Sequence, residues 1–406
     1  MPLRPILSTL SRHKTAASLI VLEVALTCAI VCNAVFLIAT RIERVERPSG
    51  MADQELVTLG TRPVGKGRDL EARTREDLAA LRAVPGVRDV GIVDVVPFGA
   101  SAHNDGVTLE PGQKTETMTI SSYQADVGLP KLLGLRLVAG RDFLPDEVQD
   151  DAAFGADAHP HLPAAILARA TAERLFPHQD AIGKVFYMYG DAPTRVVGVV
   201  ERLVRPHPDK GGVEDEYSAI LPIRQNYAGG RYVLRVDPAR RDEVLHAAKA
   251  VLDADPRRVP QEFGLLATQR ADYYRTDRQL VWLLAGVCVA MLVVTAFGIV
   301  GLASFWVQQR TRMIGTRRAL GATAGQIRRY FQLENLLLTT AGIALGMLGA
   351  YAVNRWLMTQ YELPRLPALY LPAGALLLWG LGQVAVLAPA RRASAVPPAW
   401  AMRGQT

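Results

Sequence analysis

The chain has 406 residues, 50% of them hydrophobic, and a formal net charge of +7. These averages fit a soluble protein, but four long windows together hold a single charged residue, and a helix needs about 20 apolar residues to cross a bilayer. The windows are residues 19–39, 279–307, 335–354 and 366–390. A simple soluble enzyme is therefore excluded, and four membrane spans are predicted.

The first apolar window follows basic residues near the N-terminus, which is also typical of a signal peptide. Its apolar part of about 21 residues is longer than a usual signal-peptide core. Ala39-Thr40-Arg41 is in addition a poor cleavage site. We therefore expect an uncleaved span at residues 19–40.

Two polar residues interrupt this first span, Glu23 and Asn33. An acid inside a membrane is costly and is by default a candidate for function. Glu23 stands about one turn from the inner end, where it can also pair with headgroups or a basic loop, so structural pairing and a functional gate both stay open. The spans offer few other polar groups, which argues against an ion channel or a proton-coupled carrier.

All three cysteines lie in predicted spans: Cys28, Cys32 and Cys288. The first two are one helical turn apart, but small packing residues are a better interpretation than a redox or metal pair. The extramembrane domain contains no cysteine, so disulfides do not hold it together.

Residues 41–278 hold 36 acidic and 32 basic residues and are long enough to bury a core of their own. The first part alternates strand and helix patterns, which is typical of a mixed α/β layer. The expected elements are a strand at 51–60, a helix at 69–81, a strand at 87–96, a loop at 97–106 and a strand pair at 107–109 and 115–121.

The later part of this domain repeats the strand–helix–strand order. The patterns are an apolar run at 164–168, a helix at 171–176, a hairpin at 185–189 and 194–200, a strand at 231–236, a helix at 238–253 and a strand at 262–267. We predict that the early and late units share one sheet, a porter-like mixed α/β lobe. Residues 125–228 then form an inserted β-rich lobe, which makes the whole domain α+β.

Catalytic and cofactor motifs are absent from the sequence. It contains no G-x-x-x-x-G-K-[ST], G-x-S-x-G, H-E-x-x-H or C-x-x-C pattern. His159 and His161 lack a third metal ligand at a familiar spacing. The carboxylates of residues 146–151 suit a solvated loop better than a calcium site. We therefore predict no metal site, no cofactor bound by this chain and no enzymatic activity.

The basic residues indicate the orientation in the membrane. Residues 1–14, 308–332 and 389–406 carry 12 bases and no acid, whereas the rest of the chain has 34 bases and 39 acids. Lys and Arg beside spans stay cytoplasmic. Both termini are therefore predicted inside and residues 41–278 outside. Because the bases flank spans, membrane lipids are expected partners and nucleic acid is not.

The predicted order of segments follows from these windows and charges. It is a cytoplasmic N-terminus (1–18), spans at 19–40, 279–307, 333–354 and 368–388, an outer domain (41–278), a cytoplasmic segment (308–332), an outer loop (355–367) and a cytoplasmic tail (389–406). In the third span, Gly342, Gly346 and Ala350 recur every four residues. Such a stripe lets two helices approach closely, within one copy or between two.

The segment between the second and third spans is the most informative. Residues 308–340 read QQRTRMIGTRRALGATAGQIRRYFQLENLLLTT. Ile314, Leu320 and Ile327 stand among six arginines, which favours a short amphipathic helix outside the membrane and a break at Gly321. A basic interfacial loop bound to lipid headgroups fits the same residues equally well.

The run IGTRRALGATAGQI, followed by Gln332-Leu333-Glu334, resembles the signature of FtsX-like ABC permeases of the macrolide-exporter (MacB) type. The resemblance covers nearly the whole chain, and an FtsX-like permease domain would occupy about residues 280–400. The span order, the segments SSYQADVGLPKLLGLRLVAGRDF, AAILARATAERLFPHQDAIGKVF and TRVVGVVERL, and the tail PARRASAVPPAWAMR agree with it.

The resemblance implies a permease subunit of the bacterial inner membrane, in a homodimer above a cytosolic ATPase, with a periplasmic adaptor and an outer-membrane duct as further partners. ATP would act only through that ATPase. Spans one and two would move the MacB-like periplasmic domain. The residues that would couple to the ATPase are Arg310, Arg312, Ile314, Gly315, Arg317, Arg318, Ala319, Leu320, Gly321 and Ala322.

Two departures and one alternative accompany this hypothesis. The family usually has Glu before the Ile-Gly pair, where this chain has Met313, and no ATPase motif is fused here, so the ATPase would be a separate subunit. The alternative is a regulatory scaffold that activates a periplasmic partner such as a cell-wall hydrolase. An adaptor and a duct as partners would favour export, whereas a hydrolase would favour regulation.

Overall fold

The computed structural model describes residues 14–64, 69–99, 101–151, 162–209, 211–256, 258–361 and 367–395. His159, His161 and the end of the basic tail lie outside the described residues. The chain divides into two compact units, one formed by Met1–Glu43 with Asp277–Thr406 and the other by Arg44–Thr276. They correspond to the predicted membrane part and extramembrane domain.

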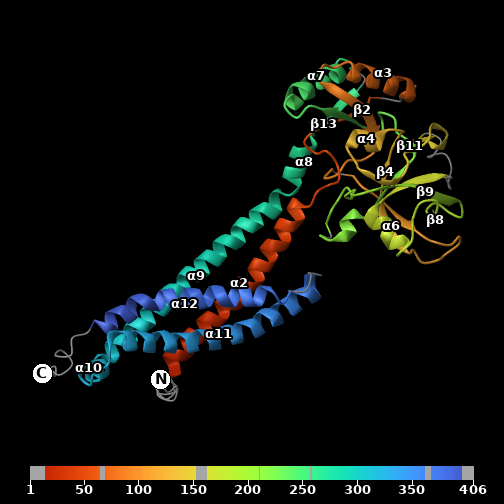
Figure 1. The fold of residues 1–406 in the computed structure, drawn as a ribbon. Helices are drawn as coiled ribbons and strands as arrows, with labels where there is room; N and C mark the ends of the chain where they lie inside the picture. The colour runs from red at the N-terminus through yellow and green to blue at the C-terminus, as the bar shows by residue number, and fades with distance from the viewer. Residues whose placement is uncertain are drawn as a thin grey trace. The chain divides into compact units, whose positions relative to one another are not determined.

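Each predicted span coincides with a long helix of the membrane unit (Figure 1). Among the described residues, four helices are long and apolar enough to cross a membrane. They are α2 (Lys14–Glu46), α9 (Arg275–Gln309), α11 (Ala324–Tyr361) and α12 (Tyr370–Ser394). A short helix, α10 (Thr311–Ala319), joins α9 to α11. The predicted four-helix architecture is confirmed.

The small-residue stripe of α11 packs within this chain, against α2. A Cβ at Gly342 would lie 2.7 Å from the Cβ of Val24, and one at Gly346 would lie 2.5 Å from the Cβ of Cys28. Only glycine permits this approach, which is the usual reason for small residues between membrane helices.

Polar side chains inside the bundle are joined across helices. Asn33 of α2 donates to the carbonyl oxygen of Ala350 at 3.1 Å, and the hydroxyls of Thr27 and Thr295 lie 2.7 Å apart. Asn335 of α11 donates to the carbonyl oxygen of Gly382 in α12 at 2.8 Å. These bonds satisfy groups that would be costly to leave unpaired in lipid.

The extramembrane unit contains a four-stranded antiparallel sheet in the order β13-β1-β12-β2. Its strands are β1 (Leu56–Pro63), β2 (Val87–Val93), β12 (Arg231–Val236) and β13 (Arg258–Leu265). The early and late strand–helix–strand units thus share one sheet, as predicted. Strand β1 starts five residues later than expected, because residues 51–55 form a bend and a turn.

Helices α3 (Leu70–Arg82) and α7 (Arg241–Asp253) cover one face of this sheet (Figure 1). Alternate strand residues point to opposite faces. Leu234 accordingly packs with Leu81 and Val244 of the two helices, whereas its neighbour Val233 belongs to the core on the other side.

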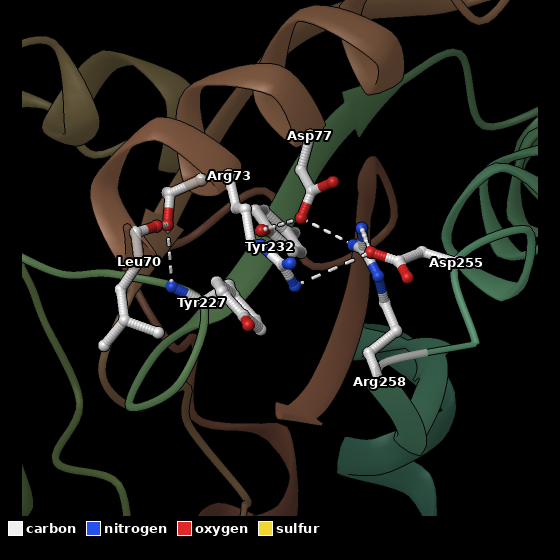
Figure 2. A network of polar contacts seen from close by, with 8 residues as sticks. Leu70, Arg73, Asp77, Tyr227, Tyr232, Asp255 and Arg258 are labelled. Atoms are coloured by element: carbon white, nitrogen blue, oxygen red, sulfur yellow. Dashed lines mark hydrogen bonds and ion pairs between the residues drawn. The ribbon is translucent and has the colours of Figure 1, made fainter. Parts of the chain in front are cut away.

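A buried polar network fastens α3 to the sheet (Figure 2). One carboxylate oxygen of Asp77 accepts from the Tyr232 hydroxyl at 2.6 Å and from Arg258 at 2.5 Å. Asp255 pairs with Arg258 at 3.3 Å and with Arg73 at 3.9 Å. Burial is the larger cause and the hydrogen bond to Asp77 the smaller cause that raise the pKa of Tyr232. Its hydroxyl therefore keeps the proton that it donates.

The inserted lobe is built on a seven-stranded mixed sheet in the order β3-β4-β10-β7-β9-β5, with β8 paired to β9. The strands are β3 (His103–Val107), β4 (Met118–Gln124), β5 (Leu137–Gly140), β7 (Ala164–Ala168), β8 (Val185–Tyr187), β9 (Pro193–Val200) and β10 (Ser218–Leu221). The predicted hairpin is β8–β9. The lobe begins earlier than the predicted residue 125, because β3 and β4 are part of this sheet.

Short elements complete the unit. They are α4 (Leu129–Leu133), α6 (Arg169–Leu175), α8 (Leu266–Tyr273), the 3-10 turns η1 (Pro145–Glu147) and η2 (Val213–Glu216), and the two-stranded pair β6 (Gln149–Asp150) and β11 (Ile223–Arg224).

Candidate functional site

The candidate site is the elbow, defined here as residues 310–326, which joins α9 to α11 and contains α10. The helix α9 ends at Gln309, and Arg310 leaves helical geometry with φ −102° and ψ 13° before α10 begins. The chain therefore turns at Arg310. Gly315, one of the predicted coupling residues, lies buried in the middle of α10.

The second turn of the elbow is a Schellman motif. Gly321 adopts φ +95°, its N–H donates to the carbonyl oxygen of Arg318, and the N–H of Ala322 donates to that of Arg317. This pattern satisfies the last carbonyls of α10 and requires a left-handed residue, which glycine adopts without strain. The predicted break at Gly321 is confirmed.

A capping box starts α11 directly after this turn. The Gln326 side chain accepts from the N–H of Thr323 at 3.0 Å, and the Thr323 hydroxyl accepts from the N–H of Gln326 at 3.3 Å. The Thr-x-x-Gln spacing is a known helix-start signal. Two adjacent caps thus fix the angle between α10 and α11.

One face of α10 is used inside the chain. Ile314 is buried with Ile327 and Phe331 of α11 and with Ala390 and Ala393 of α12. This apolar contact holds α10 on the helix bundle, so Ile314 is not a surface anchor for another protein.

The opposite face of α10 and the following turn are exposed. Leu320 is 83% exposed, and Arg312, Arg317, Ala319 and Gly321 are also exposed. An exposed apolar side chain on the same short segment as exposed guanidinium groups suits a contact with an acidic protein rim. Arg318 and Ala322 are half-buried, and Arg318 donates to the carbonyl oxygen of Ser394.

Met313 lines a small apolar hollow of about 60 Å³ between α10 and α11, together with Ile314, Ile327, Tyr330 and Phe331. Arg317 and Gln326 also contribute to this lining. The Met313 thioether, which stands where the family usually has Glu, fits the apolar part of the hollow.

Arg310 is buried, unlike the other arginines predicted to couple. It pairs with Glu334 of α11, and the two side chains are 7% and 1% exposed. Sequence reasoning gave Glu334 no role. The available signal was that Arg310 and Glu334 each stand within three residues of an uncharged window, on the same side of the membrane.

The intramembrane residue Glu23 lies against Gly298 of α9, where any side chain would collide with the carboxylate. Among the described residues it forms no hydrogen bond or ion pair, so the expected pairing partner is not found there. Asn33, in contrast, donates to the carbonyl oxygens of Ala29 and Ala350.

The spans α2 and α9 are joined by an ion pair near the ends that lead to the extramembrane unit. Arg41 of α2 forms an ion pair with Asp277 of α9, and Asp277 is 7% exposed. This pair, which the sequence did not reveal, connects the two helices that lead to the extramembrane unit.

In the extramembrane unit, Arg270 of α8 clamps the residues at the end of α2. Its guanidinium donates to Asp53 at 2.8 Å and to the carbonyl oxygens of Val45 and Arg47 at 3.0 and 2.5 Å. It also lies 5.7 Å from the centroid of the Phe98 ring. The end of α2 and helix α8 are therefore held as one body within this unit.

A hollow of about 360 Å³ separates α3 from the β6–β11 pair. The Arg224 side chain in its lining binds both Asp126 at 2.7 Å and Asp150 at 3.0 Å, so two carboxylates share one guanidinium group. No group of three or more His, Cys, Asp or Glu side chains in the described part of the chain is arranged to hold a metal ion.

Comparison with known proteins identifies both units. The model of the MacB-like periplasmic core domain matches residues 24–251, and that of the FtsX-like permease C-terminal domain matches residues 285–398. The extracellular domain of the noncanonic ABC-type transporter YknZ from Gram-positive bacteria is 16% identical and covers 50% of this chain and 100% of its own. The TM-score of this comparison is 0.31.

Two curated relatives carry the name macrolide export ATP-binding/permease protein MacB. The protein from Shewanella sp. (strain ANA-3) is 28% identical over 73% of this chain and 44% of its own length. The MacB 1/2 protein from Paracoccus denitrificans (strain Pd 1222) is 28% identical over 86% of this chain and 50% of its own length. The chain thus spans about half the length of these relatives. It is a multi-pass inner-membrane protein that belongs to the FtsX-like ABC permease family of the MacB type, with a MacB-like periplasmic core domain.

Proposed function

We propose that this chain is the permease subunit of an ABC-type export complex, which passes ATP-driven motion from a separate cytosolic ATPase to its periplasmic domain. The observation that carries the proposal is the elbow. One face of α10 is fixed on the helix bundle, and the other presents Leu320 together with the exposed Arg312 and Arg317. A lipid-bound loop would need neither this fixed orientation nor the two caps.

The mechanism uses the rigid connections described above. A push on α10 would reach α9 at the Arg310 turn, and the Arg41–Asp277 pair would make α2 move with α9. The Arg270 clamp would pass this movement to the periplasmic domain, because it binds the residues at the end of α2. Work on a periplasmic substrate then needs no polar path through the membrane.

ATP is expected to act through the partner. The relatives are named ATP-binding proteins, but these 406 residues contain no phosphate-binding loop. Their names also speak of export, which favours extrusion over a regulatory scaffold. A second copy of the chain, an adaptor and an outer-membrane duct belong to the proposed complex.

Site-specific photo-crosslinking tests the proposed contact. A photoreactive residue at Leu320 should form an adduct with the ATPase in native membranes. The same residue at Leu348, which is 71% exposed on α11 in the apolar span, is the matched control and should label lipid instead. Adducts from neither position, or equally from both, would refute the assignment of the elbow.

A further inference from the structure

The ion pair between Arg310 and Glu334 stands at the turn that starts the elbow. The Nη1 atom of Arg310 lies 2.9 Å from each carboxylate oxygen of Glu334. Both residues are almost completely buried. Arg310 directly follows α9, and Glu334 lies in the third turn of α11, so this pair links two separate spans.

The surroundings of the pair are apolar. The guanidinium group lies 5.4 Å from the centroid of the Trp306 ring, and Glu334 borders a hollow of about 10 Å³ that Ile20, Ile299 and Val386 also line. These residues come from α2, α9 and α12. Glu334 is therefore placed where all four spans meet, and Arg310 neutralises it there.

A buried ion pair of this kind is not explained by stability. The free-energy cost of desolvating two charges offsets most of their attraction. Proteins in which both partners are replaced by apolar residues are often equally stable. A buried pair is better suited to selecting one arrangement of the elements that carry it, because either charge left alone is strongly unfavourable. Here the selected arrangement is the angle between α9, α10 and α11.

The backbone at Arg310 explains why this angle needs support. The N–H of Arg310 still bonds to the carbonyl oxygen of Trp306 at 3.1 Å, and its own carbonyl oxygen starts α10 by accepting from Ile314 at 2.9 Å. No glycine stands at this turn, in contrast to the Schellman motif at the other end of α10, and the Thr311 hydroxyl donates to the carbonyl oxygens of Val307 at 3.1 Å and Gln308 at 2.8 Å. These bonds are local to the turn, whereas the side chain of Arg310 ties it to α11 through Glu334.

We propose that the Arg310–Glu334 pair is a latch that keeps α10 from bending freely at its junction with α9. It rests on the proposed function, since its purpose is to make a push on α10 move α9. Arg310 is then a positioning residue rather than a contact for the ATPase. Loss of the latch would let ATP hydrolysis proceed without useful movement.

The test uses the full chain in lipid nanodiscs, first without the ATPase. Arg310→Gln and Glu334→Gln each remove one charge of the buried ion pair, and hydrogen exchange of residues 311–319 should accelerate by about tenfold or more. Arg310→Lys is the matched control. A single nitrogen makes both contacts, so an ammonium group can replace it and exchange should stay within about threefold of wild type.

The second readout is ATP hydrolysis and export with the ATPase added. The two Gln variants should lower the export per ATP by at least about tenfold, and Arg310→Lys should largely retain it. Unchanged exchange in both Gln variants would overturn the latch. Equal loss in Arg310→Lys and Arg310→Gln would overturn it too, because charge pairing would then be irrelevant.

Leu320→Asp separates the latch from the proposed function. If this exposed change leaves stimulated hydrolysis intact, the coupling role of the elbow fails, whereas the exchange measurement still decides the latch. If Leu320→Asp abolishes stimulation and the Gln variants behave as wild type, the latch alone is wrong.

Discussion

One carboxylate of the extramembrane unit, Asp94, is buried. Asp94 is 8% exposed, its Oδ1 accepts from the N–H of Gln124 at 2.9 Å, and its Oδ2 lies 3.5 Å from His103. Burial raises the pKa of Asp94 to about 7, against the backbone N–H groups of Gln124 and Val95, which lower it. Asp94 is thus a buried acid that titrates near neutral pH.

The raised pKa gives a pH-dependent stability with a defined sign. Between about pH 4 and pH 7 the folded protein holds a proton on Asp94 that the unfolded chain has lost, so the free energy of unfolding falls as pH rises. Asp94→Asn removes this titration and keeps the acceptor for Gln124. The decrease in the free energy of unfolding between about pH 4 and pH 7 should therefore be smaller than in wild type, by up to a few kcal/mol. Thermal unfolding at several pH values measures this difference.

A control for this prediction is Asp209→Asn, which changes an exposed carboxylate of the same domain. Its unfolding temperature should follow the wild-type curve from pH 4 to pH 8. Parallel curves for wild type and Asp94→Asn would show that Asp94 does not titrate in this range.

Among the elements, the elbow depends on its two caps. Gly321 has a positive φ and no atom within 4 Å of the position of an added Cβ, so a side chain there is opposed by the backbone alone. Gly321→Ala should weaken the turn by about 1–2 kcal/mol. Hydrogen exchange of residues 311–326 measures this effect.

The matched control is Gly325→Ala, four residues further along in the first turn of α11. Alanine has the higher helix propensity, so this change should leave exchange equal or slower. If Gly321→Ala also leaves exchange unchanged, the Schellman turn does not limit the rigidity of the elbow.

The elements also show what sequence patterns reveal. The valine-rich run at 87–96 and the run at 231–236 predicted two strands, and the structure pairs them as β2 and β12. Strand β3 was missed, because its sequence HNDGV resembles a loop; its polar residues instead bond across to β4, with Asn104 accepting from Ser121 and Asp105 from Ser122. These polar residues are explained only by the pairing of β3 with β4, which the sequence of β3 alone does not reveal.

The candidate site was predicted in part for a similar reason. Gly321, Thr323 and Gln326 stand close together and carry a local capping pattern, so the break was readable from the sequence. The Arg310–Glu334 pair joins residues 24 positions apart on two helices, and their contact follows only from the packing of the spans. Hence Arg310 was grouped with the exposed arginines.

For the whole molecule, orientation is the first matter to test. The 12 bases without acids at residues 1–14, 308–332 and 389–406 predict that these segments face the cytoplasm. Reporter fusions at Gly112, an open turn of the periplasmic domain, and at the C-terminus should report opposite sides. Two fusions on the same side would contradict the proposed topology.

The central claim is that the elbow receives force from an ATPase, and stimulated ATP hydrolysis by the reconstituted pair measures it most directly. Leu320→Asp places an unpaired charge in the proposed apolar contact at a cost of about 3–5 kcal/mol. We predict that stimulation and export are lost together while insertion and the periplasmic fold survive. Leu320→Met, which keeps an apolar side chain of similar size, should retain both activities. A stimulated rate in Leu320→Asp equal to that of wild type would contradict the account.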